Sequence, residues 1–385
     1  RDEIYMERYL TKPRHVEVQV LCDQHGNAVY LGTRDCSAQR RHQKLIEEAP
    51  AFDIPESILK AMGEAAVAVA KGCDYVNAGT VEFLYENEEF YYLEMNTRLQ
   101  VEHPVTEMVT GIDLVEQQLR VAFGEELSIR QEDVEIAGHA IEVRINAEDP
   151  AEGKFLPSPG RLTTFKASAG FGTRWDGGYE EGDEISQFYD NLVGKLICWG
   201  KDRKTAIART IRALEEFEIA GLSTTIPADL AILRHPDFQD NKHSTKWVEE
   251  GLDLTGVKGS PQENTEAGSG SVIRTTEVEV DGKRFSVSMS VPSGKSQIRR
   301  SASATGASAS GGDGKITVPM QGTIVKIQVA VGDKVQSGDI LLVLEAMKME
   351  NNIASDVDGT VSEIGVSEGD SVGGGDVVIV ITPDS

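Results

Sequence analysis

The sequence predicts an α+β protein built from a mixed body of about 250 residues, a flexible linker and a small all-β domain. Patterns typical of strands and helices alternate up to residue 254. Gly, Ser and Ala then make up 15 of the 22 residues from 293 to 314, a composition typical of a flexible coil. Beyond the linker, glycines and aspartates recur at an offset of 37 residues, which predicts two copies of one short all-β motif.

The body begins with strand patterns and continues with helices. Valines alternate with polar residues over 16–20, and residues 28–31 form a second predicted strand after a turn. We predict a helix over 55–71 with Asp53 as its cap, because a proline follows the cap and a glycine ends the pattern. Apolar residues at helical spacing predict a later helix over 204–218.

The region between the body and the repeat, residues 255–314, has the weakest structural signals. Apolar residues alternate on both sides of Asp281-Gly282, which predicts a hairpin within residues 271–292. A two-stranded hairpin is marginally stable by itself, so we assign the whole stretch to a linker that contains a hairpin.

The C-terminal repeat has a clear internal order. Gly322-Thr323 returns as Gly359-Thr360, and Gly332-Asp333 returns as Gly369-Asp370. Each half has short alternating strands joined by Gly-Asp turns, and neither half can bury its apolar face alone. The two halves are therefore predicted to form a two-fold β-sandwich or flattened barrel, with their junction in a turn at residues 345–350.

Composition excludes several functions. Asp and Glu total 63 against 38 Lys and Arg, a net charge of -25, so the overall field repels nucleic acid and anionic membranes. No apolar run approaches the roughly 18–20 residues of a membrane span. The cysteines form no Cys-x-x-Cys pair, so we expect reduced thiols in a cytoplasmic protein rather than disulfides or a zinc site. They are Cys22, Cys36, Cys73 and Cys198.

Lys348 is the sharpest chemical signal in the sequence. It lies in the turn between the predicted strands over 340–344 and 351–354, with Met347 and Met349 on either side. A solvated lysine is the ordinary interpretation of a lysine in a hairpin turn, but it does not explain two exposed thioethers. We therefore predict that something recognises or covers this turn.

A second group of polar residues belongs to a predicted hairpin. Residues 81–84 and 90–96 flank a polar turn, and counting outward from it places Glu82 opposite Glu94, with Asn96 on the same face. Two like charges across a strand pair are destabilising, whereas a divalent cation between them reverses the sign. The alternative is a solvated acidic face. Against it, cationic, amide, acidic and imidazole groups follow at once, at Arg98, Gln100, Glu102 and His103.

The third group is the basic segment at residues 34–44. It holds four Arg or Lys residues and one acid in a chain that is otherwise acidic. Guanidinium and ammonium groups suit phosphate and carboxylate oxygens, so the segment predicts a pocket for a small anion. The alternative is a surface patch that pairs with acids elsewhere.

Two parts of the chain resemble known families. Residues 345–349, Glu-Ala-Met-Lys-Met, resemble the attachment sequence of biotinyl carrier domains, and the repeat over 315–382 resembles their fold. Lipoyl carriers share that fold, but their lysine normally lacks a Met on each side. From about residue 7 to residue 250 the chain resembles the biotin carboxylase family, with signatures at residues 14–17, 34–44, 94–107 and 138–150.

The resemblance implies a domain order and an activity. Residues 1–108 would be the C-terminal part of an ATP-grasp domain, 109–254 the biotin carboxylase C-terminal domain, 255–314 the linker with its hairpin, and 315–385 a biotinyl carrier domain of the barrel-sandwich hybrid fold. The implied activity is ATP- and bicarbonate-dependent carboxylation of biotin. The biotin would be held as an amide on Lys348.

The resemblance also implies roles for individual residues. Glu102 would be the general base, Arg98 a catalytic cation, and Arg144 would meet biotin. The ATP site would be formed by Glu7, Arg8, Tyr9, Leu10, His15, Gln39 and His42. Mg²⁺ or Mn²⁺ would bind Glu82, Glu94 and Asn96. Bicarbonate would bind Lys44, Arg98, Gln100 and Val101.

Partners and alternatives follow from the same resemblance. A carboxyltransferase β subunit of an acetyl-CoA or propionyl-CoA carboxylase would pass the carboxyl group to an acyl-CoA, and a biotin protein ligase would load Lys348. We expect an oligomer in the cytoplasm. The family's N-terminal domain and glycine-rich lid are not in the sequence, so we expect a fragment. Two alternatives stay open: a non-catalytic biotinylated carrier or scaffold, and the equivalent part of a pyruvate carboxylase.

Overall fold

The computed structural model describes residues 6, 8–259, 271–280, 283–292, 314–318, 321–346, 349–373 and 375–383. Within 271–292 and at residue 349, the backbone alone is described. The chain forms two compact units, Arg1–Gln262 and Glu263–Ser385. In the described part of the chain, no helix is long and apolar enough to cross a membrane.

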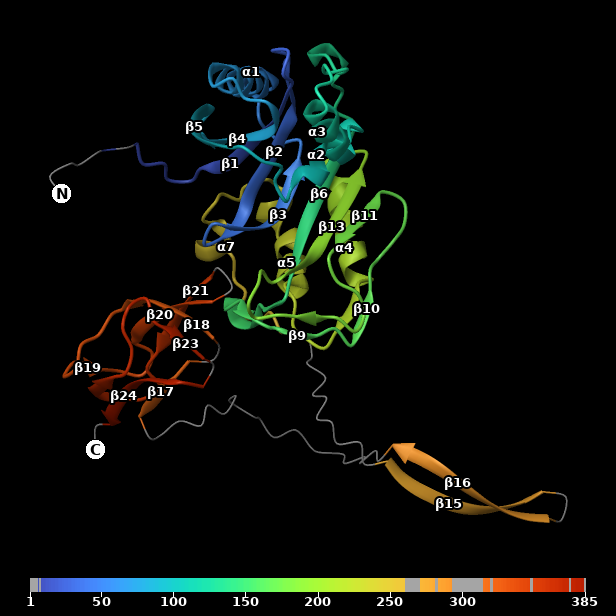
Figure 1. Ribbon diagram of the computed structural model, residues 1–385, viewed down its shortest axis with the longest axis vertical. Helices are drawn as coiled ribbons and strands as arrows, with labels where there is room; N and C mark the ends of the chain where they lie inside the picture. The colour runs from blue at the N-terminus through green and yellow to red at the C-terminus, as the bar shows by residue number, and fades with distance from the viewer. Residues whose placement is uncertain are drawn as a thin grey trace. The chain divides into compact units, whose positions relative to one another are not determined.

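An antiparallel sheet of eight strands organises the first unit (Figure 1). In spatial order the strands are β11 (Thr173–Gly177), β13 (Leu192–Gly200), β6 (His139–Asn146), β3 (Gln43–Ala49), β2 (Ala28–Arg40), β1 (Arg14–Cys22), β4 (Asn77–Glu86) and β5 (Glu89–Asn96). Short ladders accompany it: β7 (Glu148–Asp149) with β8 (Leu156–Pro157), β9 (Gly160–Arg161) with β12 (Glu184–Ile185), and β10 (Thr164–Lys166) with β14 (Glu218–Ala220). Strand β3, before the predicted domain boundary between residues 108 and 109, pairs with β6, which follows it, so one sheet contains strands from both sides. The boundary itself stays a prediction.

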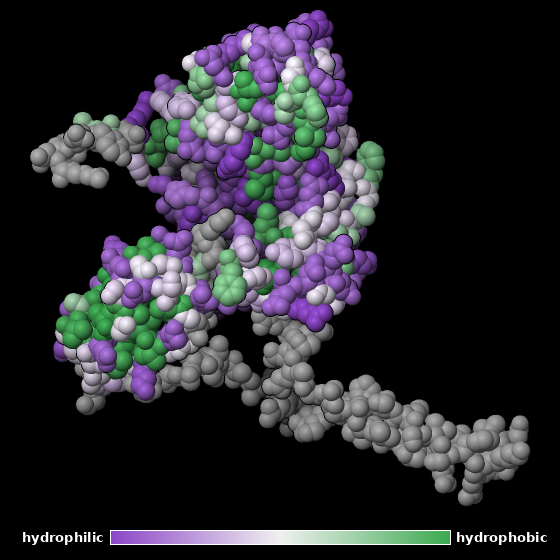
Figure 2. Space-filling model, in the orientation of Figure 1, coloured by the Kyte–Doolittle hydropathy of each residue, from purple (hydrophilic) through white to green (hydrophobic). Residues whose placement is uncertain are grey.

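Helices cover both faces of this sheet. They are α1 (Glu56–Gly72), α2 (His103–Thr110), α3 (Leu114–Ala122), α4 (Arg203–Glu215), α5 (Ile226–Arg234), α6 (Pro236–Gln239) and α7 (Trp247–Glu250), with 3₁₀ turns at Gln131–Asp133 and Ala151–Gly153. Helix α1 packs on β1 and β2, α2 on β6 and β2, α3 on β4, and α4 on β13 and β6. On the side seen in Figure 2, most of the surface of this unit is hydrophilic, as expected for so acidic a chain.

Both predicted helices are present, with shifted ends. The helix predicted over 55–71 is α1, but Asp53 as its cap is wrong: Pro55 holds the cap position and no side chain caps the helix. Asp53 has φ of 54°, a left-handed backbone, whereas a capping residue normally has an extended one. The helix predicted over 204–218 is α4, which ends at Glu215 because Glu218 begins β14.

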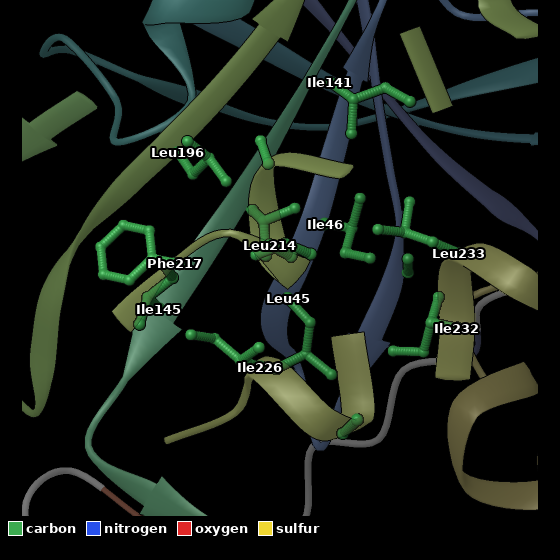
Figure 3. Packing of buried hydrophobic residues seen from close by; sticks show 14 of the residues in the cluster. Leu45, Ile46, Ile141, Ile145, Leu196, Leu214, Phe217, Ile226, Ile232 and Leu233 are labelled. Carbon is green, nitrogen blue, oxygen red and sulfur yellow. The ribbon is translucent and has the colours of Figure 1, made fainter. Parts of the chain in front are cut away.

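The two faces of the sheet differ, and this difference positions the functional site. Ile141, Val143 and Ile145 belong to an apolar cluster in which residues from β6 meet residues of α4 and α5 (Figure 3). Successive side chains along a strand point to opposite faces, so Glu142 and Arg144 face the other way, toward α2. One strand therefore contributes both to the core and to a charged layer.

The second unit contains the predicted hairpin and the predicted repeat. β15 (Ser271–Val280) pairs with β16 (Lys283–Pro292), which confirms the hairpin. The remaining strands form two four-stranded sheets, β17-β24-β22-β19 and β21-β20-β18-β23. Their bounds are β17 (Lys315–Thr317), β18 (Gly322–Ile327), β19 (Lys334–Val335), β20 (Ile340–Ala346), β21 (Met349–Ala354), β22 (Gly359–Ile364), β23 (Ser371–Val372) and β24 (Val377–Pro383).

The structure confirms the two-fold sandwich. β22, β23 and β24 begin and end 37 residues after β18, β19 and β20. The pairing repeats as well, since β18 pairs with β20 as β22 pairs with β24. Both halves contribute to one apolar core, for example through Ile324 and its repeat partner Val361, and through Leu342 and Ile379. Neither half has this core without the other.

Four turns of the repeat share one construction. Their glycines, Gly332, Gly338, Gly369 and Gly375, have φ of 100°, 99°, 93° and 90°. Each is followed by an aspartate whose carboxylate accepts a hydrogen bond from the backbone N–H three residues before it, as Asp333 does from Ala330 at 2.8 Å. Glycine supplies the left-handed backbone and aspartate closes the turn.

Replacing one of these glycines should therefore destabilise the second unit. Gly332→Ala is expected to lower its free energy of unfolding by about 1–2 kcal/mol, because an L-residue is strained at positive φ. Urea unfolding of the chain measures the change. Gly365→Ala is the matched control: Gly365 lies outside the left-handed region, and an added Cβ would be 3.6 Å from the Val377 oxygen, an ordinary contact. An equal loss in both variants would contradict the prediction.

Candidate active site

A cavity of about 700 Å³ opens in the first unit at the charged layer of the sheet. Its lining comes from the start of β1, the β2–β3 turn, strands β4, β5 and β6, and the loop before α2. The loop before α2 contributes four residues to the lining, three of which have polar or charged side chains: Arg98, Gln100, Val101 and Glu102.

Glu102 lies at the centre of the charge network in this cavity. It precedes the first residue of α2 and is 1% exposed. Lys44 Nζ lies 2.6 Å from one of its carboxylate oxygens, and Arg144 donates to the other at 2.9 Å. Arg98 also lines the cavity, but its guanidinium lies 3.4 Å from the Asn96 side-chain oxygen. The two cations that hold Glu102 are thus Lys44 and Arg144, from two different strands.

Glu17 connects this network to the sheet and was not predicted as a site residue. It is fully buried on β1, where Arg34 donates to it at 2.9 Å and Lys44 also pairs with it. Burial favours the neutral acid, but Lys44 and Arg34 outweigh it and hold the pKa of Glu17 at about 2. Lys44 therefore pairs with the carboxylates of both Glu17 and Glu102.

The acidic hairpin has the predicted register. Glu82 on β4 is the partner of Glu94 on β5, and the Asn96 amide donates to both, at 2.8 and 3.1 Å. His15 pairs with the other oxygen of Glu82 at 2.9 Å. Burial raises the pKa of Glu82, but the hydrogen bond from His15 and the charge of Lys44 bring it to about 2. Two carboxylates and an amide oxygen at one wall of the cavity are a donor set that suits a hard divalent cation.

Three protein families match the chain. "Carbamoyl-phosphate synthase L chain, ATP binding domain" matches residues 1–130, "Biotin carboxylase C-terminal domain" residues 142–250, and "Biotin-requiring enzyme" residues 314–381. The chain is also 45% identical to the biotin-dependent acyl-coenzyme A carboxylase alpha3 subunit of Mycobacterium leprae, over 92% of this chain and 62% of that protein. Over most of its length the chain is thus similar to biotin-dependent carboxylases.

Biotin carboxylases show the same likeness. The chain is 51% identical to the biotin carboxylase of Haemophilus influenzae over 66% of this chain and 56% of that enzyme. The solved biotin carboxylase of Campylobacter jejuni superposes with a TM-score of 0.61 at 46% identity, covering 63% of this chain and 54% of that structure. The chain thus spans about half to three fifths of the length of these relatives.

The structure places most of the predicted site residues of this chain in the one cavity. The predicted metal ligands, the predicted bicarbonate residues and the predicted catalytic residues all line it, together with three of the predicted ATP residues, His15, Gln39 and His42. Arg8, Tyr9 and Leu10 are described but do not line it. Arg8 pairs with Glu89 at 3.4 Å, and the Tyr9 hydroxyl accepts a hydrogen bond from Lys246 at 2.6 Å. Glu7 and Lys348 lie outside the described residues.

The basic segment at residues 34–44 does not form a single pocket. It continues the predicted strand over 28–31, so that β2 extends to Arg40. Arg34 is fully buried against Glu17, and Arg40 donates to the carbonyl of Lys154. From the end of the segment, Gln39 and residues 42–44 reach the cavity. The charged residues are close in the sequence, but Arg34, Arg40 and Lys44 have different surroundings in the structure.

Proposed function

We propose that this chain is part of the biotin carboxylase and biotin carrier subunit of an acyl-CoA carboxylase, and that it carboxylates biotin held on Lys348 with ATP and bicarbonate. The arrangement of Glu102 carries this proposal. A carboxylate held at 2.6 and 2.9 Å by two cations, inside a cavity that also holds an acidic metal-binding hairpin, suits deprotonation of an anionic substrate.

Bicarbonate would bind between the cations of the cavity and the loop before α2. Lys44 and Arg98 neutralise its charge, while the side chain of Gln100 and the backbone of Val101 supply further hydrogen-bonding groups. Bicarbonate would attack the γ-phosphoryl group of ATP, which forms carboxyphosphate and breaks the bond to the leaving ADP, and Glu102 would accept the proton that bicarbonate loses. Fixed cations in a partly buried site stabilise the charge that develops in that step.

Mg²⁺ or Mn²⁺ would bind the hairpin side of the same cavity. Glu82, Glu94 and Asn96 supply the oxygen donors that such ions prefer. A bound ion neutralises phosphate charge during phosphoryl transfer. His15, Gln39 and His42 would contact the nucleotide beside it, together with Glu7, Arg8, Tyr9 and Leu10 from the segment that precedes β1.

The domain organisation that we propose assigns these roles to separate parts of the chain. Residues 1–108 form the C-terminal part of an ATP-grasp domain, 109–254 the biotin carboxylase C-terminal domain, 255–314 a linker, and 315–385 the biotinyl carrier. Biotin on Lys348 supplies the ureido nitrogen that carries the carboxyl group, and Arg144 is the residue that meets it in the cavity.

The relatives favour an acyl-CoA as the final acceptor. The mycobacterial acyl-CoA carboxylase matches over 92% of this chain, and the methylcrotonoyl-CoA carboxylase of Mus musculus matches over 91% at 37% identity. A pyruvate carboxylase component of Methanothermobacter thermautotrophicus is 53% identical, but it matches over 64% of the chain. The carrier domain is thus shared with the acyl-CoA carboxylases, which supports acetyl-CoA or propionyl-CoA as acceptor.

The proposed partners follow from this assignment. A carboxyltransferase β subunit would take the carboxyl group, and a biotin protein ligase would load Lys348. The assembly is proposed to be an oligomer. The free thiols support a cytoplasmic location: three cysteines are buried, Cys73 is exposed, and all four are unpaired.

The proposal is tested by measuring bicarbonate-dependent ATP cleavage and biotin carboxylation by a chain that also carries the N-terminal segments of its relatives. With ATP, Mg²⁺, labelled bicarbonate and biotin, we expect release of phosphate and transfer of label to biotin, both abolished when bicarbonate or the metal is omitted. A protein loaded with biotin that cleaves no ATP under these conditions would instead be a non-catalytic carrier or scaffold.

A further inference from the structure

A second pair of carboxylates lies behind the cavity. Glu47 on β3 and Glu142 on β6 are register partners, and both are fully buried. Directly opposite side chains in an antiparallel pair have Cβ atoms about 4.5–5.5 Å apart, so these two carboxyl groups share one small space. Neither lines the cavity.

The two carboxylates differ in their partners. One oxygen of Glu47 accepts a hydrogen bond from Arg144 at 2.6 Å, and its other oxygen has no hydrogen-bond partner among the described residues. Neither oxygen of Glu142 has a partner in the described part of the chain. Two adjacent buried charges with unpaired oxygens are costly. A single proton on Glu142 removes the repulsion and gives the free oxygen of Glu47 a donor.

We propose that Glu142 is protonated in the folded protein, and that Glu47 and Glu142 together act as positioning residues for Arg144. The inference rests on the proposed function, in which Arg144 meets biotin. The same terminal nitrogen of Arg144 lies 2.6 Å from Glu47 and 2.9 Å from Glu102. One negative charge on the Glu47–Glu142 pair anchors the guanidinium without drawing it away from Glu102.

The surrounding charges support protonation of Glu142 rather than Glu47. Burial and the charge of Glu47 raise the pKa of Glu142 well above its ordinary value. Burial raises the pKa of Glu47 as well, but Arg144 opposes that rise by direct contact. Lys195, the register partner of Arg144 on β13, donates to the carbonyl of Val101 at 2.7 Å. Lys195 and Arg144 act to lower the pKa of Glu142 and Glu102 acts to raise it, whereas Lys44 acts to lower the pKa of Glu47 and Glu102 to raise it.

Three variants separate charge from shape in a chain that also carries the N-terminal segments of its relatives. Glu47→Gln and Glu142→Leu are expected to lower kcat for biotin carboxylation about 10- to 100-fold, the effect of a lost hydrogen bond to a charged group, with KM for ATP unchanged. Glu142→Gln keeps the shape and a donor N–H toward Glu47, so it is expected to recover most of the activity lost in Glu142→Leu.

The outcomes distinguish the inference from the proposed function. An inactive wild type counts against the proposed function. With an active wild type, the inference is overturned if Glu47→Gln has wild-type kcat, or if Glu142→Gln loses as much activity as Glu142→Leu.

Thermal unfolding of this chain tests the proton on Glu142 without any activity. Because folding raises the pKa of Glu142, its contribution to stability is complete below the ordinary carboxyl pKa and is lost as the pH rises toward the folded value. Glu142→Gln removes that titration, so its Tm should rise relative to wild type as the pH is raised above the ordinary carboxyl pKa. A difference in Tm between Glu142→Gln and wild type that does not change with pH would overturn the inference.

Discussion

Glu102→Gln is expected to lower bicarbonate-dependent biotin carboxylation by at least about 100-fold. Glutamine keeps the shape of the side chain and can still occupy its buried place at the start of α2, but its amide cannot accept a proton from bicarbonate. The change also removes the shared charge partner of Lys44 and Arg144, at 2.6 and 2.9 Å. ATP binding should change little, because Glu102 is not proposed to contact the nucleotide.

Arg98→Ala is expected to cost about 10²–10³ in the same rate, as the loss of one preorganised cation does in other oxyanion sites. Lys44 and Arg144, rather than Arg98, hold the carboxylate of Glu102. Arg98 lines the cavity beside Asn96, so its removal is expected to weaken binding and charge stabilisation of bicarbonate instead.

Steady-state carboxylation rates of a chain that carries the N-terminal segments decide this prediction. Glu116→Gln and Arg120→Ala are matched controls, because these residues form an exposed ion pair at 2.7 Å on α3. Surface changes of this kind alter stability by no more than about 0.5 kcal/mol, so their rates should remain within about threefold of wild type. A near-wild-type rate for Glu102→Gln would show that the active site lies elsewhere.

Local patterns in the sequence were sufficient where the partners are close in the chain. The polar turn between β4 and β5 fixes the register of that hairpin, so Glu82 and Glu94 could be placed opposite each other by counting. The C-terminal repeat was predictable for the same reason. The strands of each half come from one continuous segment, and the second segment follows the first at an offset of 37 residues. Turn chemistry, glycine followed by aspartate, marked its strand ends.

Buried acids were the residues that the sequence could not reveal. Glu17 alternates with valines along β1, which normally indicates a solvent-facing position, but in this strand both faces are covered. The partner that explains it, Arg34, becomes its neighbour through strand pairing. Glu47 and Glu142 are register partners although they lie far apart in the chain. This pair forms only because β3 and β6 are neighbours in the sheet, and no local sequence pattern predicts that these two strands pair.

Lys348→Arg is expected to abolish biotin incorporation. Biotinylation joins the carboxyl group of biotin to the Nε amine of lysine as an amide, and a guanidinium is protonated at all working pH values and cannot take its place. After co-expression with a biotin protein ligase, intact-mass spectrometry should find one added biotinyl group on the wild-type chain and none on the variant. Peptide mapping should place the group on the peptide that contains Lys348.

A second lysine of the same unit, Lys326, provides a matched control for this experiment. Strands β20 and β21 end and begin at Ala346 and Met349, which are register partners, so the sequence Met347-Lys348 connects two paired strands at the middle of the repeat. Lys326 lies on β18 in the same unit and has no methionine beside it. Lys326→Arg should therefore incorporate biotin like the wild type. Biotin retained in Lys348→Arg, or lost in Lys326→Arg, would show that recognition does not depend on the lysine between the two methionines.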